Sequence, residues 1–160
     1  MSNITILASE GTSIGPLGLV KLFGAQTGNS FSLAEHPLGP GRLLAPMHTH
    51  RHEDEYSFVL AGEIMAQIGT EVVTAPAGTL VLKPRGVPHT VWNVSTRPAR
   101  ILEIISPAGF EAYFVELAEI LSRPGQPDLS RITALAQRYG LEFDFGSIET
   151  LSQTYNVSLD

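Results

Sequence analysis

Three histidines and one glutamate, closely spaced in two short segments, are the residues of this chain best suited to chemistry. His48 and His50 lie in the segment MHTH, and Glu55 opens the run EYSFVLAG. His89 follows the segment PRGVP and opens the run HTVWNV. Imidazole nitrogens and carboxylate oxygens are ligands of divalent transition metals, so the four residues predict a metal site.

The expected strands determine where these side chains point. Successive side chains of a strand face opposite sides, so His48 and His50, separated only by Thr49, project to the same side. Glu55 stands at the start of the next expected strand, and a hairpin would bring its carboxylate back beside the histidines. His89 stands at the mouth of a strand after a turn signal rich in glycine and proline, and its ring would close the site.

The two segments resemble the two sequence motifs of the cupin superfamily. The first motif is matched by a glycine, the H-x-H pair, a glutamate and a second glycine, here Gly41, His48, His50, Glu55 and Gly62. Gly41 lies one residue further upstream of His48 than in the family pattern. The second motif is matched at the family spacing by Gly78, Pro84, Gly86, His89 and Asn93. The short separation of the motifs is typical of small single-domain cupins.

The resemblance implies a mainly β fold, a cupin jelly-roll barrel (double-stranded β-helix), and one divalent metal ion bound by His48, His50, Glu55 and His89. The chain is identified as a member of the small monocupins of the cupin 2 conserved-barrel type. Its tail, with GFEAYFVELAEIL and LAQRYGLEFD, resembles the tails of quercetin-dioxygenase-like cupins. A fold of this kind hosts many activities, so the function must be argued from the site.

The pattern of apolar residues independently predicts a barrel followed by helices. From residue 4 to about residue 106, short alternating runs such as ITILA, LGLVKLF and ARILEIIS are punctuated by glycine and proline, as in β-sandwiches and barrels. After Pro107 the apolar residues fall at helical spacing, Asp128 is placed to cap a second helix that Gly140 stops, and Ser147 is placed to cap a third. We therefore expect a barrel over 1–106 and a helical extension over 107–160 that packs on the barrel, as one domain.

Composition excludes several classes of protein. With 160 residues, of which 43% are hydrophobic, the chain suits one globular domain. It has no cysteine, which excludes disulfides and thiol nucleophiles. The formal charge of -6 and the scattered basic residues argue against nucleic-acid binding. No secretory signal and no membrane-spanning run is evident, so we expect a cytoplasmic location and no membrane partner.

Residues near the motifs have several candidate roles. Candidates for contact with the metal ligands or the substrate are His52, Gln67 and Asn93, although each also suits an ordinary structural or surface role. Glu53 is expected in a solvated acidic turn, with the alternative that it holds a ligand imidazole by its second nitrogen. Three further residues, His36, Lys83 and Arg85, are expected at the surface, and Trp92 is expected in core packing or a dimer contact.

Four protein ligands leave one or two coordination positions open to substrate or dioxygen. This favours a metal-dependent dioxygenase acting on a small flavonol-like or diketone-like substrate, with Glu55 also accepting the substrate proton. The alternatives are a metal-dependent isomerase, epimerase or decarboxylase, for which His52 is the candidate acid-base group, and a non-catalytic cupin that binds a small molecule. The N and O ligands suit Fe, Mn, Ni, Cu, Co and Zn alike. A homodimer is expected because two-fold dimers are the commonest oligomers.

Overall fold

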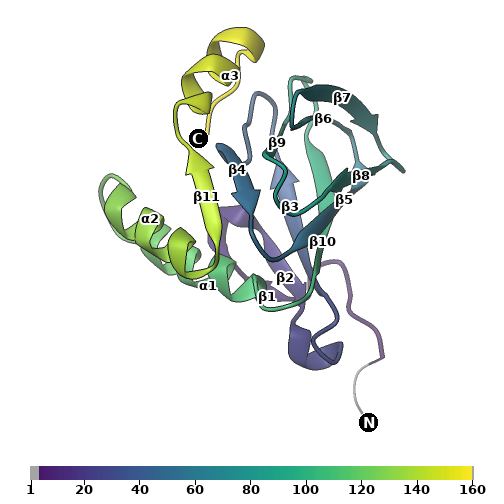
Figure 1. The fold of residues 1–160 in the computed structure, drawn as a ribbon. Helices are drawn as coiled ribbons and strands as arrows, with labels where there is room; N and C mark the ends of the chain where they lie inside the picture. Colours follow the sequence, from purple (N-terminus) through teal and green to yellow (C-terminus); the bar gives the residue numbers. More distant parts are fainter. Residues whose placement is uncertain (1–3, 160) are drawn as a thin grey trace.

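Two antiparallel β-sheets face each other and form a jelly-roll barrel, with a C-terminal segment that contains three helices along one side (Figure 1). The structure is a computed structural model, and it describes residues 4–159. The ends of the two expected segments, residues 1–3 and residue 160, lie outside the described residues. The expected cupin-type barrel with a C-terminal helical part is confirmed.

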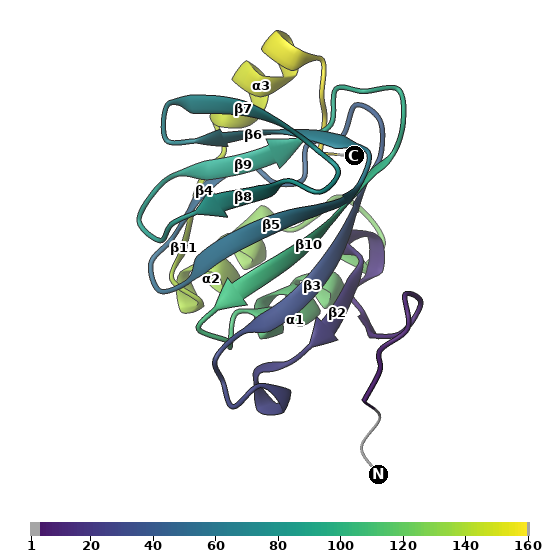
Figure 2. The ribbon, with the colours of Figure 1, turned by 90° about the vertical axis from the view of Figure 1, so that its right-hand side faces the viewer.

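The strand order places the two sheets as the walls of the barrel (Figure 2). Across the six-stranded sheet the strands are β1 (Thr12–Ser13), β2 (Leu19–Leu22), β3 (Ser32–Leu38), β10 (Ala99–Ser106), β5 (Asp54–Ala61) and β8 (Leu80–Lys83). Across the five-stranded sheet they are β11 (Leu141–Asp144), β4 (Met47–His50), β9 (His89–Trp92), β6 (Glu63–Ile68) and β7 (Glu71–Pro76). Two short 3-10 helices, η1 (Gly15–Leu17) and η2 (Gly24–Gln26), flank β2.

Alternating burial along the strands produces the core between the sheets. In β3 and β10 every second side chain is buried, because successive side chains point to opposite faces. The largest apolar cluster contains Leu38, Val59, Ile64, Val91 and Ile101. It fills one end of the barrel interior and leaves the other end for polar groups.

The run ITILA was expected to form the first strand, and this prediction is wrong. Residues 4–8 are not in a strand, and Ile4 is 94% exposed. The strand that pairs with the outer edge of β2 is β1, with Thr12 opposite Val20. An apolar run forms a strand only where it finds a hydrogen-bonding edge and a surface to cover, and β1 takes that edge of β2.

The expected helices are present as α1 (Glu111–Leu121), α2 (Leu129–Arg138) and α3 (Ser147–Tyr155). Asp128 caps α2 as expected, since its carboxylate accepts a hydrogen bond from the Arg131 backbone N–H. Ser147 does not cap α3: it is the first helical residue, and its hydroxyl donates to the Asp144 carbonyl. Within residues 4–159, no helix has the length and apolar character needed to cross a membrane.

The C-terminal segment also contributes a strand that the helical pattern did not predict. Strand β11 pairs antiparallel with β4, with Leu141 opposite His50 and Phe143 opposite His48. Gly140, with φ of 67°, turns the chain from α2 into this strand. Four residues between two helices are too short a run for a period of two to be recognised. The pairing joins the tail directly to the strand that carries two of the histidines.

Trp92 lies in a second cluster on the outer side of the five-stranded sheet. Its ring packs with Leu43, Leu151 and Val157 beneath α3, and the side chain is fully buried. Trp92 is therefore in core packing as expected, but on the outer face of the five-stranded sheet and not between the two sheets. Helix α3 covers this face of the barrel (Figure 1).

We propose that the barrel and the C-terminal segment unfold as one cooperative unit, and Leu141→Ala tests this. Leu141 is buried with Ile105, Phe110 and Leu135, so truncation should cost about 2 to 4 kcal/mol of unfolding free energy. Urea denaturation measures the change. The control Leu129→Ala, at a side chain 61% exposed, should stay within about 0.5 kcal/mol of wild type. A separate transition for the tail would contradict the proposal.

Candidate metal centre

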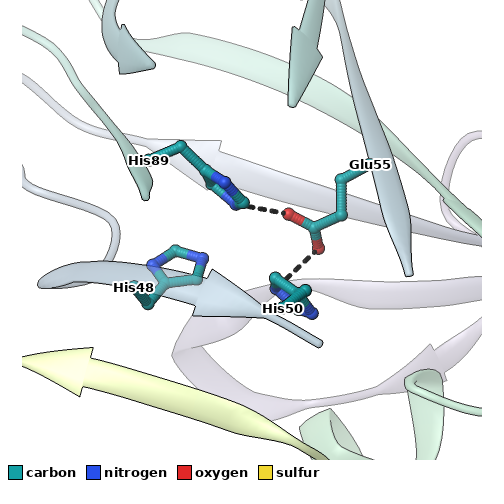
Figure 3. A group of neighbouring side chains, drawn as sticks. All are labelled: His48, His50, Glu55 and His89. Carbon is teal, nitrogen blue, oxygen red and sulfur yellow. Dashed lines mark hydrogen bonds and ion pairs between the residues drawn. The ribbon is translucent and has the colours of Figure 1, made fainter. Parts of the chain in front are cut away.

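The four residues singled out by the sequence come together inside the barrel (Figure 3). One potential ligand atom from each of His48, His50, Glu55 and His89 lies within 4.8 Å of the others. His48 and His50 lie in β4 and point to the same side, as the period of a strand requires. His89 is the first residue of the neighbouring strand β9, directly opposite His48 in the ladder.

Glu55 reaches this cluster by a different route from the expected hairpin. Strands β4 and β5 belong to different sheets, and β5 pairs with β10 and β8 instead. The connection at residues 51–53 crosses from one sheet to the other, so Glu55 faces the histidines across the barrel interior. The expected proximity holds, but it results from two facing sheets and not from a hairpin.

Backbone carbonyls orient two of the imidazole rings. His48 Nδ1 lies 2.8 Å from the Pro46 carbonyl oxygen, and His89 Nδ1 lies 2.9 Å from the Val87 carbonyl oxygen. A carbonyl only accepts, so in each ring Nδ1 carries the proton and donates it. The lone pair of a neutral ring is then on Nε2. This is the arrangement in which an imidazole binds a metal through Nε2.

Glu53 takes the role given to it as an alternative. Its Oε2 lies 3.4 Å from His50 Nδ1, and its side chain is largely buried. The carboxylate accepts from Nδ1, so the Nε2 lone pair of a neutral His50 ring is again the free one. A residue expected in a solvated turn therefore helps to orient His50.

The donor atoms fit a cation. His89 Nε2 lies 3.1 Å from Glu55 Oε2, and His50 Nε2 lies 3.4 Å from Glu55 Oε1. With neutral rings held as above, each contact brings two lone pairs together, which is favourable only with a positive charge shared between them. Ligands bonded at about 2.1 Å from a common ion are about 3 Å apart when they are at right angles. The residues present therefore suit one divalent transition metal ion.

The carboxylate of Glu55 is kept ionised by its surroundings. Burial alone would raise the pKa of Glu55, but Lys83, whose Nζ lies 3.0 Å from Oε2, and the neighbouring His50 and His89 overcome this effect. The resulting pKa is well below the usual value for glutamate. Glu55 is thus a charged ligand at neutral pH.

The expectation that Lys83 is solvated is wrong. Its side chain is 4% exposed and its Nζ also lies 2.8 Å from Glu103 Oε2, while the Ser57 hydroxyl donates to the same carboxylate. Lys83 shares the inward parity of Val81 in β8 and sits opposite Glu55 in the ladder. Burial lowers the pKa of Lys83, but the attraction of Glu103 and Glu55 is stronger and the net effect is a raised pKa.

Arg85, in contrast, is exposed as expected, and its guanidinium pairs with Asp54 at the surface. Two basic residues on either side of Pro84 therefore have opposite environments. Only the parity of β8, which ends at Lys83, distinguishes them. The segment LVLK offered no such signal, because three of its four residues are apolar and the alternation appears only in their burial.

The expectation for His36 is also wrong. This residue was expected at the surface, yet it is 3% exposed and faces inward from β3 with Ala34 and Leu38. Its Nδ1 lies 2.6 Å from the Leu17 carbonyl oxygen. Burial lowers the pKa of His36, and also holds the pKa of His48 well below that of a free imidazole. Both rings are therefore neutral at neutral pH, as a ligand or a base must be.

The three further candidates lie outside this cluster. His52 is exposed and lies close to Gly140. Gln67 donates a hydrogen bond to the Gly69 carbonyl. Asn93 is fully buried, but its amide donates to the Leu38 and Arg97 carbonyls and accepts from the Ser95 N–H. Its hydrogen bonds are those of a structural amide that holds a turn.

The metal ligands line a cavity of about 550 Å³. The charged network of Glu55, Lys83 and Glu103 also lines it, together with His36. Much of the remaining wall is apolar and comes from the C-terminal segment, including Phe110, Phe114, Leu117, Ile132 and Phe143. The site thus combines a polar patch with room for an organic molecule, and the tail that β11 attaches to β4 provides much of the enclosure.

Comparisons with known proteins agree with the fold. Residues 35–105 match the family model described as Cupin domain. A protein with a double-stranded β-helix domain from Klebsiella pneumoniae matches with a TM-score of 0.52 and 22% identity, over 65% of this chain and 84% of that chain. A predicted oxalate decarboxylase from Thermotoga maritima matches with a TM-score of 0.53 and 23% identity, over 56% and 77%. No curated protein gives a significant match.

The matched segment includes all four potential ligands. Residues 35–105 therefore match a cupin domain, and the similar structures share the barrel fold. The resemblance drawn from the two motifs is confirmed at this level. The superfamily identifies the fold and leaves the reaction to the site.

The buried network predicts a large effect of Lys83→Met. The substitution leaves Glu55 and Glu103 buried without their cation, so the metal-free protein should lose about 3 kcal/mol or more of unfolding free energy, as measured in urea. The double variant Lys83→Met/Glu103→Gln should recover part of the loss, because one buried negative charge is removed. Arg85→Met, which breaks an exposed pair, should cost much less. Equal losses for Lys83→Met and Arg85→Met would contradict this account.

Proposed function

We propose that His48, His50, Glu55 and His89 bind one divalent transition metal ion and that the protein is a quercetinase-like dioxygenase. Its substrate would be a small oxygenated molecule with flavonol-like or diketone-like oxygens. One observation carries the proposal: the four donors converge on the wall of a cavity of about 550 Å³ whose other walls are largely apolar. A site of this kind accommodates an organic molecule beside the ion.

A bound redox-active metal would supply Lewis acidity toward adjacent substrate oxygens and electron transfer with dioxygen. The protein supplies the remaining functions. Glu55 accepts the proton of a substrate hydroxyl group, and Lys83 stabilises the ionised form that is needed to accept it. The apolar walls exclude water. An oxidative cleavage that places both atoms of dioxygen in the products takes its electrons from the substrate bonds that break, so the overall reaction needs no external reductant.

A metal-dependent isomerase, epimerase or decarboxylase is the second candidate, and His36 is the observation that favours it. Such a reaction needs an acid-base group besides the metal ligands. His52, the residue first considered for this role, is exposed. His36 lines the cavity, and burial keeps its imidazole neutral and able to accept a proton. Oxygen consumption during turnover separates the first candidate from the second, and binding without turnover would support a non-catalytic cupin.

The first test is the metal content of tag-free protein by plasma mass spectrometry. Wild type should retain near-stoichiometric Fe, Mn, Ni, Cu or Co, and His50→Ala should lose most of it, because one of four ligands and its Glu53 contact are removed. The matched control is His52→Ala, which removes an exposed histidine and should retain the metal. Metal-loaded wild type should then consume oxygen with flavonols or diketones. Failure of wild type to retain any divalent metal after reconstitution would contradict the proposal.

We also propose that the protein is a homodimer. A strip of exposed apolar side chains on the outer face of β5 and β8, formed by Phe58, Leu80 and Leu82, supports this. Strand β8 is an edge of its sheet, so a two-fold related copy can approach the strip without obstruction from a further strand. Apolar side chains gathered on one face commonly mark a contact between chains.

Light scattering after size exclusion tests the dimer. Wild type should elute with twice the mass of one chain, and Leu82→Lys should shift the protein toward the monomer, because Leu82 is 55% exposed within the strip. Val94→Lys is the control, since Val94 is also exposed but lies outside the strip. Wild-type protein with the mass of a single chain would overturn the proposal.

A further inference from the structure

Arg42 faces the cavity because of its place beside Leu43. Leu43 bridges to Trp92 and is fully buried in the cluster beneath α3. The neighbouring side chains, Arg42 and Leu44, therefore lie on the opposite face of this extended segment, and both line the cavity. Arg42 is itself paired through its backbone with Ser158, which fixes the base of the side chain.

Within residues 4–159, Arg42 lacks an acidic partner. Lys83, the other basic residue of the cavity wall, lies between Glu55 and Glu103. No carboxylate lies within salt-bridge distance of the Arg42 guanidinium in this part of the chain, and its Nε is buried without a hydrogen-bond partner. A buried donor without a partner is costly, so the position favours an acceptor that comes from outside the chain.

The charge balance of the cavity also favours an anion. Arg42 and Lys83 contribute positive charge to the wall, and Glu55 and Glu103 contribute negative charge. A divalent metal on the four ligands would add two positive charges, and within residues 4–159 no further carboxylate of the wall offsets them. An organic anion would compensate part of this excess.

A second cavity residue has an unpaired donor. Tyr113 of α1 is buried beside Phe110 and Phe114, and its hydroxyl is without a hydrogen-bond partner among the described residues. Burial raises the pKa of Tyr113, so the phenol stays protonated and available to donate. The Arg42 Nε and the Tyr113 hydroxyl group of the wall thus both lack a hydrogen-bond acceptor in the described part of the chain, and the side chains around them are apolar.

We infer that the ligand of this cavity is an organic carboxylate with an apolar chain or ring as its body, and that Arg42 binds the carboxylate. The planar guanidinium matches a carboxylate with two parallel hydrogen bonds. The apolar body lies against the walls that α1, α2 and β11 provide, such as Leu117, Ile132 and Phe143. The inference rests on the proposed function in one respect: it takes this cavity as the substrate site.

Calorimetric titration with a series of phenylalkanoates, and with the corresponding neutral amides, tests the inference. At least one carboxylate should bind wild type about tenfold or more tightly than its amide, as a charge-assisted hydrogen-bonded pair provides. Arg42→Gln should remove this preference and leave amide binding within about twofold, and Arg42→Lys should keep part of it. The control Arg97→Gln removes the same charge from an exposed position and should bind like wild type.

The titrations are run with metal-loaded and with metal-free protein, so that the two proposals fail separately. Dependence on Arg42 in both forms supports the inference even if no oxygen is consumed and the proposed reaction is wrong. A carboxylate preference that disappears with the metal and is unchanged in Arg42→Gln assigns the anion to the metal and overturns the role of Arg42. No measurable binding of any carboxylate in the series also overturns it.

Discussion

A carboxylate inside an apolar barrel needs compensating positive charge, and the arrangement of the site depends on this constraint. Glu55 is compensated by Lys83, directly opposite in the ladder between β5 and β8. Lys83 is in turn held by Glu103, and Glu103 by the Ser57 hydroxyl. Register thus places every member of the network. The ionised ligand is in position before any metal binds, so binding requires little rearrangement of the protein.

Strand β4 connects this network to the rest of the molecule. It carries two histidines, pairs with β9 and its His89 on one side, and pairs with β11 on the other. Because β11 belongs to the C-terminal segment, the pairing holds α1 and α2 close to the metal ligands. The three histidine ligands and much of the apolar wall of the cavity therefore belong to one hydrogen-bonded sheet and the helices attached to it, whereas Glu55 faces them from the other sheet.

The sequence was sufficient for the barrel and for the set of four ligands, because the motif spacing implies both, although it did not show that Glu55 reaches the histidines from the facing sheet. The sequence was insufficient wherever the structure of a segment depends on which strand it pairs with in the fold. ITILA has the composition of a strand but no sheet edge to join, and LEFD is too short to be recognised. His36 and Lys83 are polar residues within strands, and only the fold shows that their side chains point into the barrel. Asn93 belongs to the motif, yet its amide holds a turn.

The metal ligands and the apolar wall of the cavity come from different parts of the chain, so each can change in evolution without the other. All four potential ligands lie between residues 48 and 89, whereas most of the apolar wall comes from residues beyond 109. Coordination and molecular fit are thus encoded in different stretches of sequence. Replacement of bulky side chains in the tail would change the size of the cavity without displacing the metal ion. Proteins with the same metal ligands can then bind different organic molecules.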